Sequence, residues 1–289
     1  MKIIRKVFQI LVILLMISLF IRGVVFIFDA DTGAIDINKG DFIAVLEING
    51  IIASADDFIG KMKELSEKTN LKGVLLRVNS PGGLVTPSQE IYEYLKTLKI
   101  PLYVSMGATA ASGGYMVALP AKKIYAMPST ITGSIGVIME IPNYKLLMDK
   151  IGITFKTIKS GEFKDTGNAS RDMTEAEETY LRGIVMDMYS QFVQAVSDSR
   201  DISYEQAEEA ANGKVYTGKA ALALGLVDEL GSWQEALEGL KTEIGDSKIK
   251  HMNIKYGEEE GWKKYLSQIP TLFGREEFPR PGFYFMMKF

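Results

Sequence analysis

Two kinds of apolar pattern alternate along the middle of this chain, and their alternation restricts the fold more than any other feature of the sequence. Five runs are short, rich in β-branched or aromatic residues and bounded by Gly, Pro or Asn, as strands usually are. They are FIAVLEI (42–48), GVLLRV (73–78), PLYVSM (101–106), KKIYAM (122–127) and ITFKTI (153–158). Helical patterns lie between them, with shared apolar faces at Ile91, Leu95 and Leu98 and at Leu146, Leu147 and Ile151. This order predicts a parallel α/β sheet, and the short β-β-α units favour a spiral of such units over one flat doubly wound sheet.

A long helical region is predicted after residue 173. Thr174 and Glu177 form a T-x-x-E capping box, and a second box precedes another helix at Ser203 and Gln206. The first box is followed by an apolar stripe at helical spacing, made of Leu181, Ile184, Val185, Met188, Phe192 and Val196. Such a stripe is typical of a protein core or a subunit interface, so we assign it no chemistry.

The N-terminal segment predicts a membrane anchor. Residues 7–28 read VFQILVILLMISLFIRGVVFIF and are apolar except for Gln9, Ser18 and Arg22. As a helix this segment would be about 33 Å long, against a hydrocarbon core of about 30 Å. The basic residues that precede it predict a cytoplasmic N-terminus, with the rest of the chain across the cell membrane; they are Lys2, Arg5 and Lys6. A cleaved signal peptide is the alternative, but the following FDADTGAID offers no clear small-x-small cleavage site.

Length and composition exclude several classes of protein. The 289 residues, 47% hydrophobic and 24% charged, can bury a full core. We divide the chain into an anchor (1–28), a linker (29–40), a folded domain (41–256) and a tail (257–289). A net charge of −3 provides no basic field for nucleic acid. Because the chain has no cysteine and one histidine, we expect no disulfide, no thiolate or histidine-built metal site and no cysteine nucleophile. We also expect no cofactor.

Two glycine-rich motifs could carry chemistry. VNSPGG (78–83) is either an ordinary tight turn or a loop in which Gly83 directs its backbone N–H at developing negative charge, as an oxyanion hole requires. GATAASGGYMVALP (107–120) places Ser112 among alanines and glycines. Ser112 is either a helix N-cap or a nucleophile. In the second case its small neighbours leave room for a substrate backbone, and the N–H of Gly113 serves as a second oxyanion donor.

Two further loops hold a serine and two lysines. Ser134 lies in TITGSIGVI (130–138), where the local pattern indicates no more than a turn. IKSGEFKDTG (158–167) holds Lys159 and Lys164, and each is either simply solvated or a general base. A free lysine amine has a pKa near 10.4, and lowering it by about three units costs about 4 kcal/mol, which burial can supply. The adjacent Asp165 opposes this change unless its carboxylate points elsewhere.

Lysine is a better-supported base than histidine. A Ser-His-Asp triad needs a histidine to accept the serine proton. His251 lies in KIKHMNIKY, a strand-like segment of alternating lysines, and is interpreted as an exposed or edge residue. A Ser-Lys dyad is therefore the favoured arrangement.

Taken together, these motifs resemble those of the signal peptide peptidase A family, the membrane-anchored Ser-Lys serine peptidases of the wider Clp and crotonase fold group. The shared motifs are NSPGG, AASGGY, TGSIGVI, SGEFKDTG followed by MTEAEE, and GKVYTGKAALALGLVDELG (213–231). They span roughly residues 42–235 in the family's order, and the chain is similar to the short, single-repeat form. The resemblance implies a Clp/crotonase-like spiral of β-β-α units with a helical C-terminal extension, preceded by one transmembrane helix.

The resemblance also implies a role for each candidate site residue. Ser112 would be the nucleophile and Lys164 the general base, which leaves Lys159 the less suitable lysine. Ser134 would form a hydrogen bond to the Lys164 amine and so orient it. The oxyanion N–H groups would belong to Gly83 and Gly113.

The implied substrates are remnant signal peptides and other membrane-proximal peptides, hydrolysed through an acyl-enzyme. An extended peptide would pair as an added strand with the backbone of Gly83, Leu84 and Val85. Short members of the family assemble as rings in which the serine of one subunit meets the lysine of its neighbour. The apolar tail PGFYFMMKF could itself lie in the substrate groove, where it would inhibit the enzyme or be trimmed.

Three other functions are compatible with parts of the sequence. A crotonase-type acyl-CoA enzyme also uses two backbone N–H groups as an oxyanion hole, but the anchor and the Ser112–Lys164 pair argue against it. A Clp-like protease needs a histidine base soon after the serine, and this chain has none there. A catalytically inactive membrane scaffold would need only the fold, and the intact dyad residues argue against it.

Overall fold

The computed structural model describes residues 40–257 and 283–286, together with Met16. A compact unit begins at Asp41. Apart from Met16, the predicted anchor (7–28) lies outside the described residues, as does most of the predicted tail. Within the part of the chain that the structure describes, no helix is long and apolar enough to cross a bilayer.

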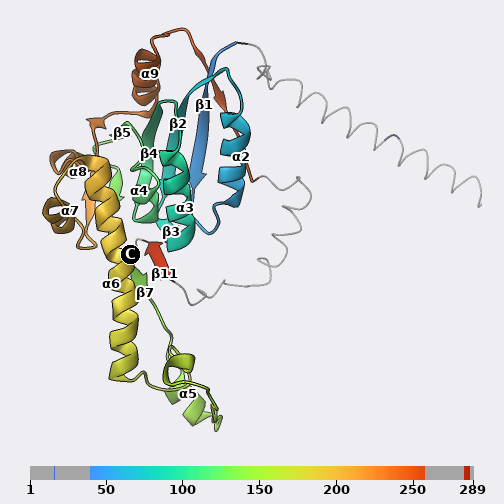
Figure 1. Ribbon diagram of the computed structural model, residues 1–289, viewed down its shortest axis with the longest axis vertical. Helices are drawn as coiled ribbons and strands as arrows, with labels where there is room; N and C mark the ends of the chain where they lie inside the picture. The colour runs from blue at the N-terminus through green and yellow to red at the C-terminus, as the bar shows by residue number, and fades with distance from the viewer. Residues whose placement is uncertain (1–15, 17–39, 258–282, 287–289) are drawn as a thin grey trace, which may run out of the picture. The chain divides into compact units, whose positions relative to one another are not determined.

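A largely parallel sheet forms the centre of the unit (Figure 1). Its main path runs β10-β1-β2-β4-β5-β9, and every neighbouring pair on that path is parallel. The six strands are β1 (Phe42–Asn49), β2 (Leu71–Ser80), β4 (Leu102–Ala111), β5 (Lys123–Ala126), β9 (Glu229–Leu230) and β10 (Lys250–Asn253). Four of them, β1, β2, β4 and β5, lie where the short apolar runs predict them, and the predicted parallel α/β sheet is confirmed.

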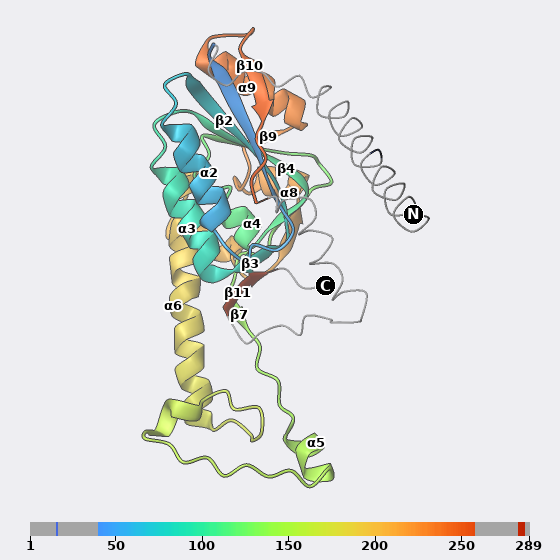
Figure 2. The ribbon, with the colours of Figure 1, turned by 90° about the vertical axis from the view of Figure 1, so that its right-hand side faces the viewer.

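Helices cover both faces of this sheet, which is why its strands are apolar on both sides (Figure 2). α2 (Asp56–Ser66) and α3 (Val85–Lys96) lie on one face, and α9 (Trp233–Ile244) lies on the other. α3 buries Ile91 and Leu95 as predicted. Against α9 the core consists of Ile43, Val45, Leu75, Tyr103, Tyr125, Ala236, Leu237, Leu240 and Ile249.

Short strands extend the sheet at one end and form a second, smaller one. β6 (Ile131–Gly133) pairs with the end of β4 and with β8 (Val215–Thr217). In the second sheet, β11 (Phe283–Met286) pairs antiparallel with both β3 (Gly82–Leu84) and β7 (Ile138–Met139). A strand from the C-terminal tail therefore lies between two segments from the middle of the chain (Figure 1).

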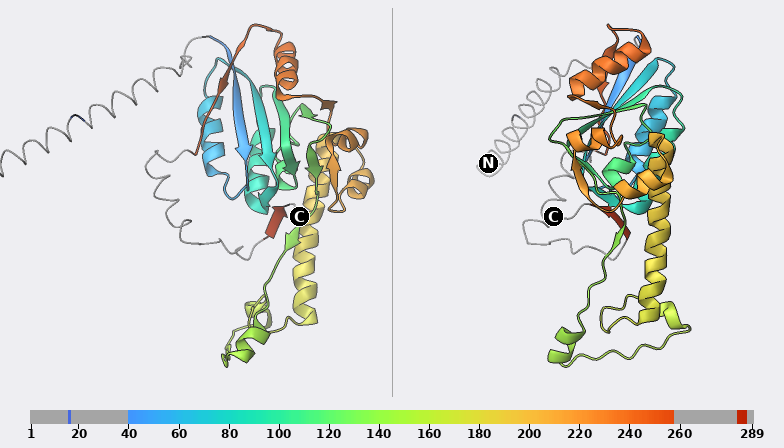
Figure 3. Two further views of the ribbon diagram at one scale, coloured as in Figure 1. Left: turned by 180° about the vertical axis from the view of Figure 1, so that it is seen from behind. Right: turned by 90° about the vertical axis from the view of Figure 1, so that its left-hand side faces the viewer.

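A 26-residue helix, α6 (Glu175–Arg200), carries an extension away from the sheet (Figures 1 and 3). Apart from Glu177, its buried side chains begin at Phe192, so only its C-terminal part packs into the core. The extension consists of residues 140–174, which we call the arm. It contains α5 (Lys145–Lys150) and the 3-10 turn η1 (Glu162–Asp165). Both predicted capping boxes are confirmed, one before α6 and one before α7 (Tyr204–Ala210).

One strand prediction in the arm is wrong. The segment ITFKTI (153–158) has no regular structure, and its apolar side chains are exposed by 46% at Ile153, 64% at Phe155 and 91% at Ile158. A strand is stable only beside a neighbour that accepts its backbone hydrogen bonds. Among the described residues no strand pairs with this segment.

Apolar side chains on the arm and on the first half of α6 are only partly covered. Leu146 and Leu147 lie in α5 but are 76% and 58% exposed. In the predicted apolar stripe, Phe192 and Val196 are buried, whereas four residues nearer the helix start are half-buried, namely Leu181, Ile184, Val185 and Met188. The stripe is therefore core at one end of α6 and partly open surface at the other.

An ion pair fixes the C-terminal end of α6 to the sheet. Arg200, whose side chain is 6% exposed, donates from Nη2 to Asp228 Oδ1 at 2.7 Å and from Nη1 to Oδ2 at 3.1 Å. Its Nε donates to the Gly225 carbonyl at 2.9 Å. Asp228 Oδ2 also accepts the backbone N–H of Ile124 in β5 at 2.7 Å. The helix end and the strand thus share one carboxylate.

Replacing Arg200 by Met should lower the free energy of unfolding by about 3 kcal/mol, because the half-buried Asp228 carboxylate would lose its largely buried partner. Arg182, whose exposed pair with Glu178 lies on the same helix, is the matched control. Its replacement by Met should cost less than about 1 kcal/mol. Urea unfolding followed by circular dichroism measures both values, and equal midpoints would contradict the role given to Arg200.

Candidate active site

Three of the predicted motifs meet where β2, β4 and β6 end. Ser80 at the end of β2 lies opposite Ala110 in β4, and Ala111 lies opposite Gly133 in β6. The carboxyl ends of parallel strands share one edge of a sheet, which is where α/β proteins place their sites. The structure thereby brings together the NSPGG loop, Ser112 and the residue after Gly133, which is Ser134.

Ser112 occupies a sharp turn from β4 into the short helix α4 (Gly113–Met116). Its φ of 53° and ψ of −118° are a conformation that residues other than glycine rarely adopt, at a cost of about 1–3 kcal/mol. Its backbone N–H donates to the Gly133 carbonyl at 2.7 Å.

The Ser112 hydroxyl does not cap the helix. Ser112 stands at the N-cap position of α4, yet its side chain makes no capping hydrogen bond. The residue is fully buried, and Oγ has no hydrogen-bond partner among the described residues. A buried hydroxyl without a partner is uncommon in native structures and calls for an explanation. The N-cap interpretation therefore holds for the position but not for the side chain.

Glycine is required at two positions around this serine because other backbone comes too close for a side chain. A Cβ on Gly114 would lie 2.6 Å from the Ser80 carbonyl oxygen, and a Cβ on Gly83 would lie 2.1 Å from that of Ile52. Gly113 opens α4, where first-turn N–H groups have no partner within the helix. Gly83 thus lies against the backbone of Ile52, and Gly113 directly follows Ser112 at the start of α4.

Ser134 directly follows Gly133, whose carbonyl accepts the Ser112 N–H, and Ser134 lines a groove. Its φ is 49°, and its backbone N–H donates to the Lys214 carbonyl at 2.7 Å. The groove has a volume of about 1180 Å³ and is lined by β7, by the middle of α6 and by residues around Lys214. It contains both apolar and acidic side chains, including Val185 and Glu208.

β11 occupies the edge of β3 that was predicted to bind substrate. Phe285 lies opposite Gly83 and Tyr284 opposite Leu84, while Tyr284 also lies opposite Ile138 of β7. β11 contacts α4 as well. The ladder ends at Leu84, and Val85 is the buried first residue of α3, so backbone pairing does not extend to it.

Lys164 is not near Ser112 within one chain. It lies in η1 on the arm with an exposed side chain. Its neighbour Asp165 is tied through Arg171 to Glu177, at the start of α6. From Glu177 to Phe192, where α6 enters the core, the helix rises about 22 Å. One chain thus brings together the serines and the glycines of the predicted site, but not its base.

The two candidate lysines differ in their contacts. Lys159 Nζ donates to the Glu162 carbonyl and to Asp165 Oδ1, both at 2.6 Å. Lys164 is held, among the described residues, only by its main-chain N–H, which donates to the Gly161 carbonyl at 3.2 Å.

His251 lies far from these serines. It belongs to β10, at the edge of the sheet, and pairs with Ile43 at the start of β1, whereas the site lies at the strand ends. Its ring packs against Trp233 at 6.0 Å. The edge position predicted for His251 is confirmed. In the part of the chain that is described, no group of three or more acidic or histidine side chains could hold a metal ion.

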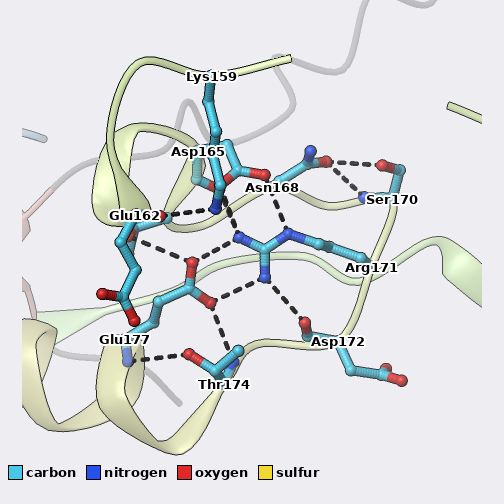
Figure 4. A network of polar contacts seen from close by, with 10 residues as sticks. Lys159, Glu162, Asp165, Asn168, Ser170, Arg171, Asp172, Thr174 and Glu177 are labelled. Carbon is cyan, nitrogen blue, oxygen red and sulfur yellow. Dashed lines mark hydrogen bonds and ion pairs between the residues drawn. The ribbon is translucent and has the colours of Figure 1, made fainter. Parts of the chain in front are cut away.

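Sequence reasoning missed the ion network centred on Arg171 (Figure 4). Arg171 binds Asp165, six residues before it, and Glu177, six residues after it. The segment between them is mostly turn and loop rather than helix or strand, so periodicity could not reveal the pairing. The available signal was a lone arginine midway between two acids in a loop that also holds the candidate base.

Comparison with known protein families gives two matches. A model described as peptidase family S49 matches residues 95–245, just over half of the chain. A model described as Clp protease matches residues 43–132. The first range includes Ser112, Ser134 and Lys164, and the second includes the NSPGG loop.

Individual relatives agree with these matches. A candidate protease from Synechocystis sp. is 41% identical over 206 residues, which cover 70% of this chain and 74% of that protein. A candidate signal peptide peptidase from Enterococcus faecium is 38% identical over 217 residues, covering 70% and 63% of the two chains. The solved structure of the 1510-N membrane-bound stomatin-specific protease has a TM-score of 0.51 at 16% identity, covering 75% of this chain and 99% of that one. At that identity the likeness shows the fold alone.

The strain at Ser112 can be measured by comparing two variants that both lack the hydroxyl. Ser112→Gly relieves about 1–3 kcal/mol of backbone strain, while the greater freedom of unfolded glycine removes about 0.4–1 kcal/mol of stability. Ser112→Gly should therefore be about 1 kcal/mol more stable than Ser112→Ala in chemical denaturation. A glycine variant no more stable than the alanine variant would mean that the turn is unstrained.

Proposed function

The chain belongs to peptidase family S49, the signal peptide peptidase A family, and on that basis we propose that it is a serine peptidase with Ser112 as nucleophile and Lys164 as general base. The observation that carries the proposal is the state of Ser112, which is buried, strained and without a hydrogen bond from Oγ among the described residues. Both features destabilise the folded chain, so their coincidence at one residue points to a function.

In the proposed reaction, the neutral Lys164 amine takes the Ser112 Oγ proton as Oγ attacks the carbonyl carbon of the peptide bond. The N–H groups of Gly83 and Gly113 stabilise the oxyanion that forms. As the intermediate collapses, the C–N bond breaks and the Lys164 ammonium gives its proton to the leaving amine. The same amine then takes a proton from a water molecule, which attacks the acyl-enzyme carbonyl carbon. As the ester bond to Oγ breaks, the Lys164 ammonium returns that proton to Oγ and restores both Ser112 and the neutral amine. Ser134, beside the nucleophile, would orient the amine by a hydrogen bond.

In this proposal the base comes from a second copy of the chain. Lys164 lies on the arm, while the groove beside Ser134 is open. Large apolar side chains are exposed on the same arm, notably Leu146, Phe155 and Ile158. Exposed apolar surface of this extent is typical of a protein–protein interface. We therefore propose a homo-oligomeric ring in which the arm of one subunit reaches the Ser134 groove of its neighbour.

The proposed substrates are extended peptides at the membrane, chiefly remnant signal peptides. A peptide would pair with β3 as β11 does, and the alanines and glycines at 110–114 would leave space for small or apolar side chains. The proposed anchor, residues 7–28, would hold the site close to the extracytoplasmic face of the cell membrane. An inactive scaffold of the same fold is the alternative that the first experiment below tests.

Ser112→Ala and Lys164→Ala should each reduce peptide cleavage by about a thousandfold or more, because neither half of the dyad acts alone. Oligomer size should not change. Lys156→Ala, which removes another exposed lysine from the arm, and His251→Ala should both retain activity. The measurements are cleavage of a fluorogenic signal peptide and light scattering. Activity that is lost in His251→Ala but kept in Lys164→Ala would contradict the proposed dyad. Failure of a covalent serine probe to label the wild type would favour the inactive scaffold.

The shared site can be tested by co-expressing the two dyad variants. In mixed rings about one interface in four joins an intact serine to an intact lysine, so about a quarter of wild-type activity should return. Mixed oligomers that remain inactive would mean that both residues act within one chain.

β11 is proposed as an internal competitor for the substrate site, because it occupies the β3 edge and contacts α4. Phe285→Pro should raise kcat/KM for an added peptide several-fold, mainly through a lower KM, since proline cannot donate to the ladder and is poorly accommodated in a paired strand. Deletion of residues 283–289 should act in the same direction. Mass spectrometry of the wild type and of Ser112→Ala reports any trimming of the tail. Unchanged kinetics together with an unchanged mass would remove the idea.

A further inference from the structure

The lysine proposed as the base is followed directly by an acid. A carboxylate within about 4–6 Å of an amine favours the ammonium form, whereas a general base must be neutral. Asp165 would therefore hold Lys164 in its protonated form if the carboxylate faced the amine. In Figure 4 the Asp165 side chain instead faces Arg171 and Lys159.

Arg171 binds Asp165 through two parallel hydrogen bonds. Nε donates to Oδ2 at 3.0 Å and Nη2 donates to Oδ1 at 2.9 Å, an arrangement that lysine cannot reproduce. Nη2 also donates to the Asp165 main-chain carbonyl at 3.2 Å. Lys159 adds a bond to Oδ1 at 2.6 Å. These hydrogen bonds, from Arg171 first and Lys159 second, hold the pKa of Asp165 well below its usual value.

Glu177 fixes Arg171 to the start of α6. Arg171 Nη1 donates to Glu177 Oε2 at 2.8 Å, and Nη2 donates to Oε1. The Glu177 side chain is only 3% exposed and also accepts the Thr174 N–H at 2.9 Å in the capping box. Arg171, followed by the Thr174 backbone, lowers the pKa of Glu177 to about 2. The Asp165 carboxylate is thus tied to a capped helix rather than to a free loop.

Opposite charges in this network are equal in number, with Lys159 and Arg171 facing Asp165 and Glu177. Other titratable groups beside it are Glu162 in η1, Asp172, which pairs with Lys145, and Tyr180 of α6, whose ring contacts Phe163. Without Arg171, two carboxylates would face a single cation from Lys159. Negative charge would then predominate beside Lys164.

We propose that Arg171 is a positioning residue for the base, which holds the Asp165 carboxylate so that the Lys164 amine has no counter-ion. The proposal rests on the proposed role of Lys164. Arg171 acts through Asp165 and touches neither Ser112 nor the peptide. Its guanidinium keeps Asp165 ionised and hydrogen-bonded. The arm can therefore present Lys164 to the neighbouring subunit without an ion-pair partner.

The test is the pH dependence of kcat/KM in the full-length protein, with a fluorogenic peptide as substrate. The acid limb of this profile reports loss of the proton from the base of the free enzyme. In Arg171→Gln the released carboxylate favours the ammonium form, so the limb should move to higher pH by about one unit. Below the limb, activity at a fixed pH should fall about tenfold.

The decisive variant is Arg171→Gln combined with Asp165→Asn. It lacks the arginine as the single variant does, but it also lacks the carboxylate, so its acid limb should return to the wild-type position. Arg171→Lys keeps a positive charge but cannot form the two parallel hydrogen bonds to Asp165. Its acid limb should therefore lie between those of the wild type and Arg171→Gln. Arg182→Gln removes an exposed arginine from the neighbouring helix α6 and should not move the limb. Circular dichroism and light scattering monitor the fold and assembly of each variant.

An active Arg171→Gln enzyme with an unmoved limb would overturn the proposal. So would a double variant as impaired as the single one, because Arg171 would then serve only the fold of the arm. If the single variant is inactive, recovery in the double variant supports the proposal and lack of recovery refutes it. If the proposed role of Lys164 as the base is itself wrong, Lys164→Ala would keep its activity, so this outcome can be distinguished from the others.

Discussion

The hydrogen bond from the Ser112 N–H to the Gly133 carbonyl joins the ends of β4 and β6, and the geometry of the site depends on it. β4 continues past β5 to pair with β6 as far as Ala111, and the chain must then turn sharply into α4. That turn gives Ser112 its positive φ, and the residue after Gly133 is Ser134. A single backbone contact therefore sets the position of both serines, and the close approach of Gly114 to Ser80 adds the NSPGG loop.

α6 connects the sheet, which holds the serines, to the arm, which holds Lys164. At its C-terminal end the helix is fixed to β5 by Arg200 and Asp228, with a largely buried guanidinium. At its other end a second arginine, Arg171, joins the arm to Glu177. The helix between them contributes few buried side chains, so it acts as a spacer held at both ends by ion pairs. Through these contacts the loop of Lys164 is connected to the core by one helix with an ion pair at each end.

Much of the sheet could be predicted from the sequence, because β1, β2, β4 and β5 are largely apolar and bounded by turn residues. The run ITFKTI has the same local composition, yet it has no neighbour to pair with, and a local pattern does not report neighbours. The position of Ser112 before a helix was predictable for the same local reasons. Its unpaired hydroxyl was not, since the hydrogen-bond partners of a side chain depend on the tertiary fold. The pairing of Asp165 with Arg171 could not be predicted either, because the loop between them has no periodic sequence pattern.

The seating of β11 against β3 also has a consequence for the kind of substrate that could use this edge. A strand tethered to the same chain competes at an effective concentration of about millimolar, whatever the total amount of protein. A dilute peptide in free solution is outcompeted by such a tether unless its affinity is much higher. A peptide that is confined to a membrane surface beside the site can reach a local concentration comparable to that of the tethered strand, even when few copies are present. Competition from β11 would thus favour peptides that reach the β3 edge along a surface over peptides that diffuse to it from dilute solution.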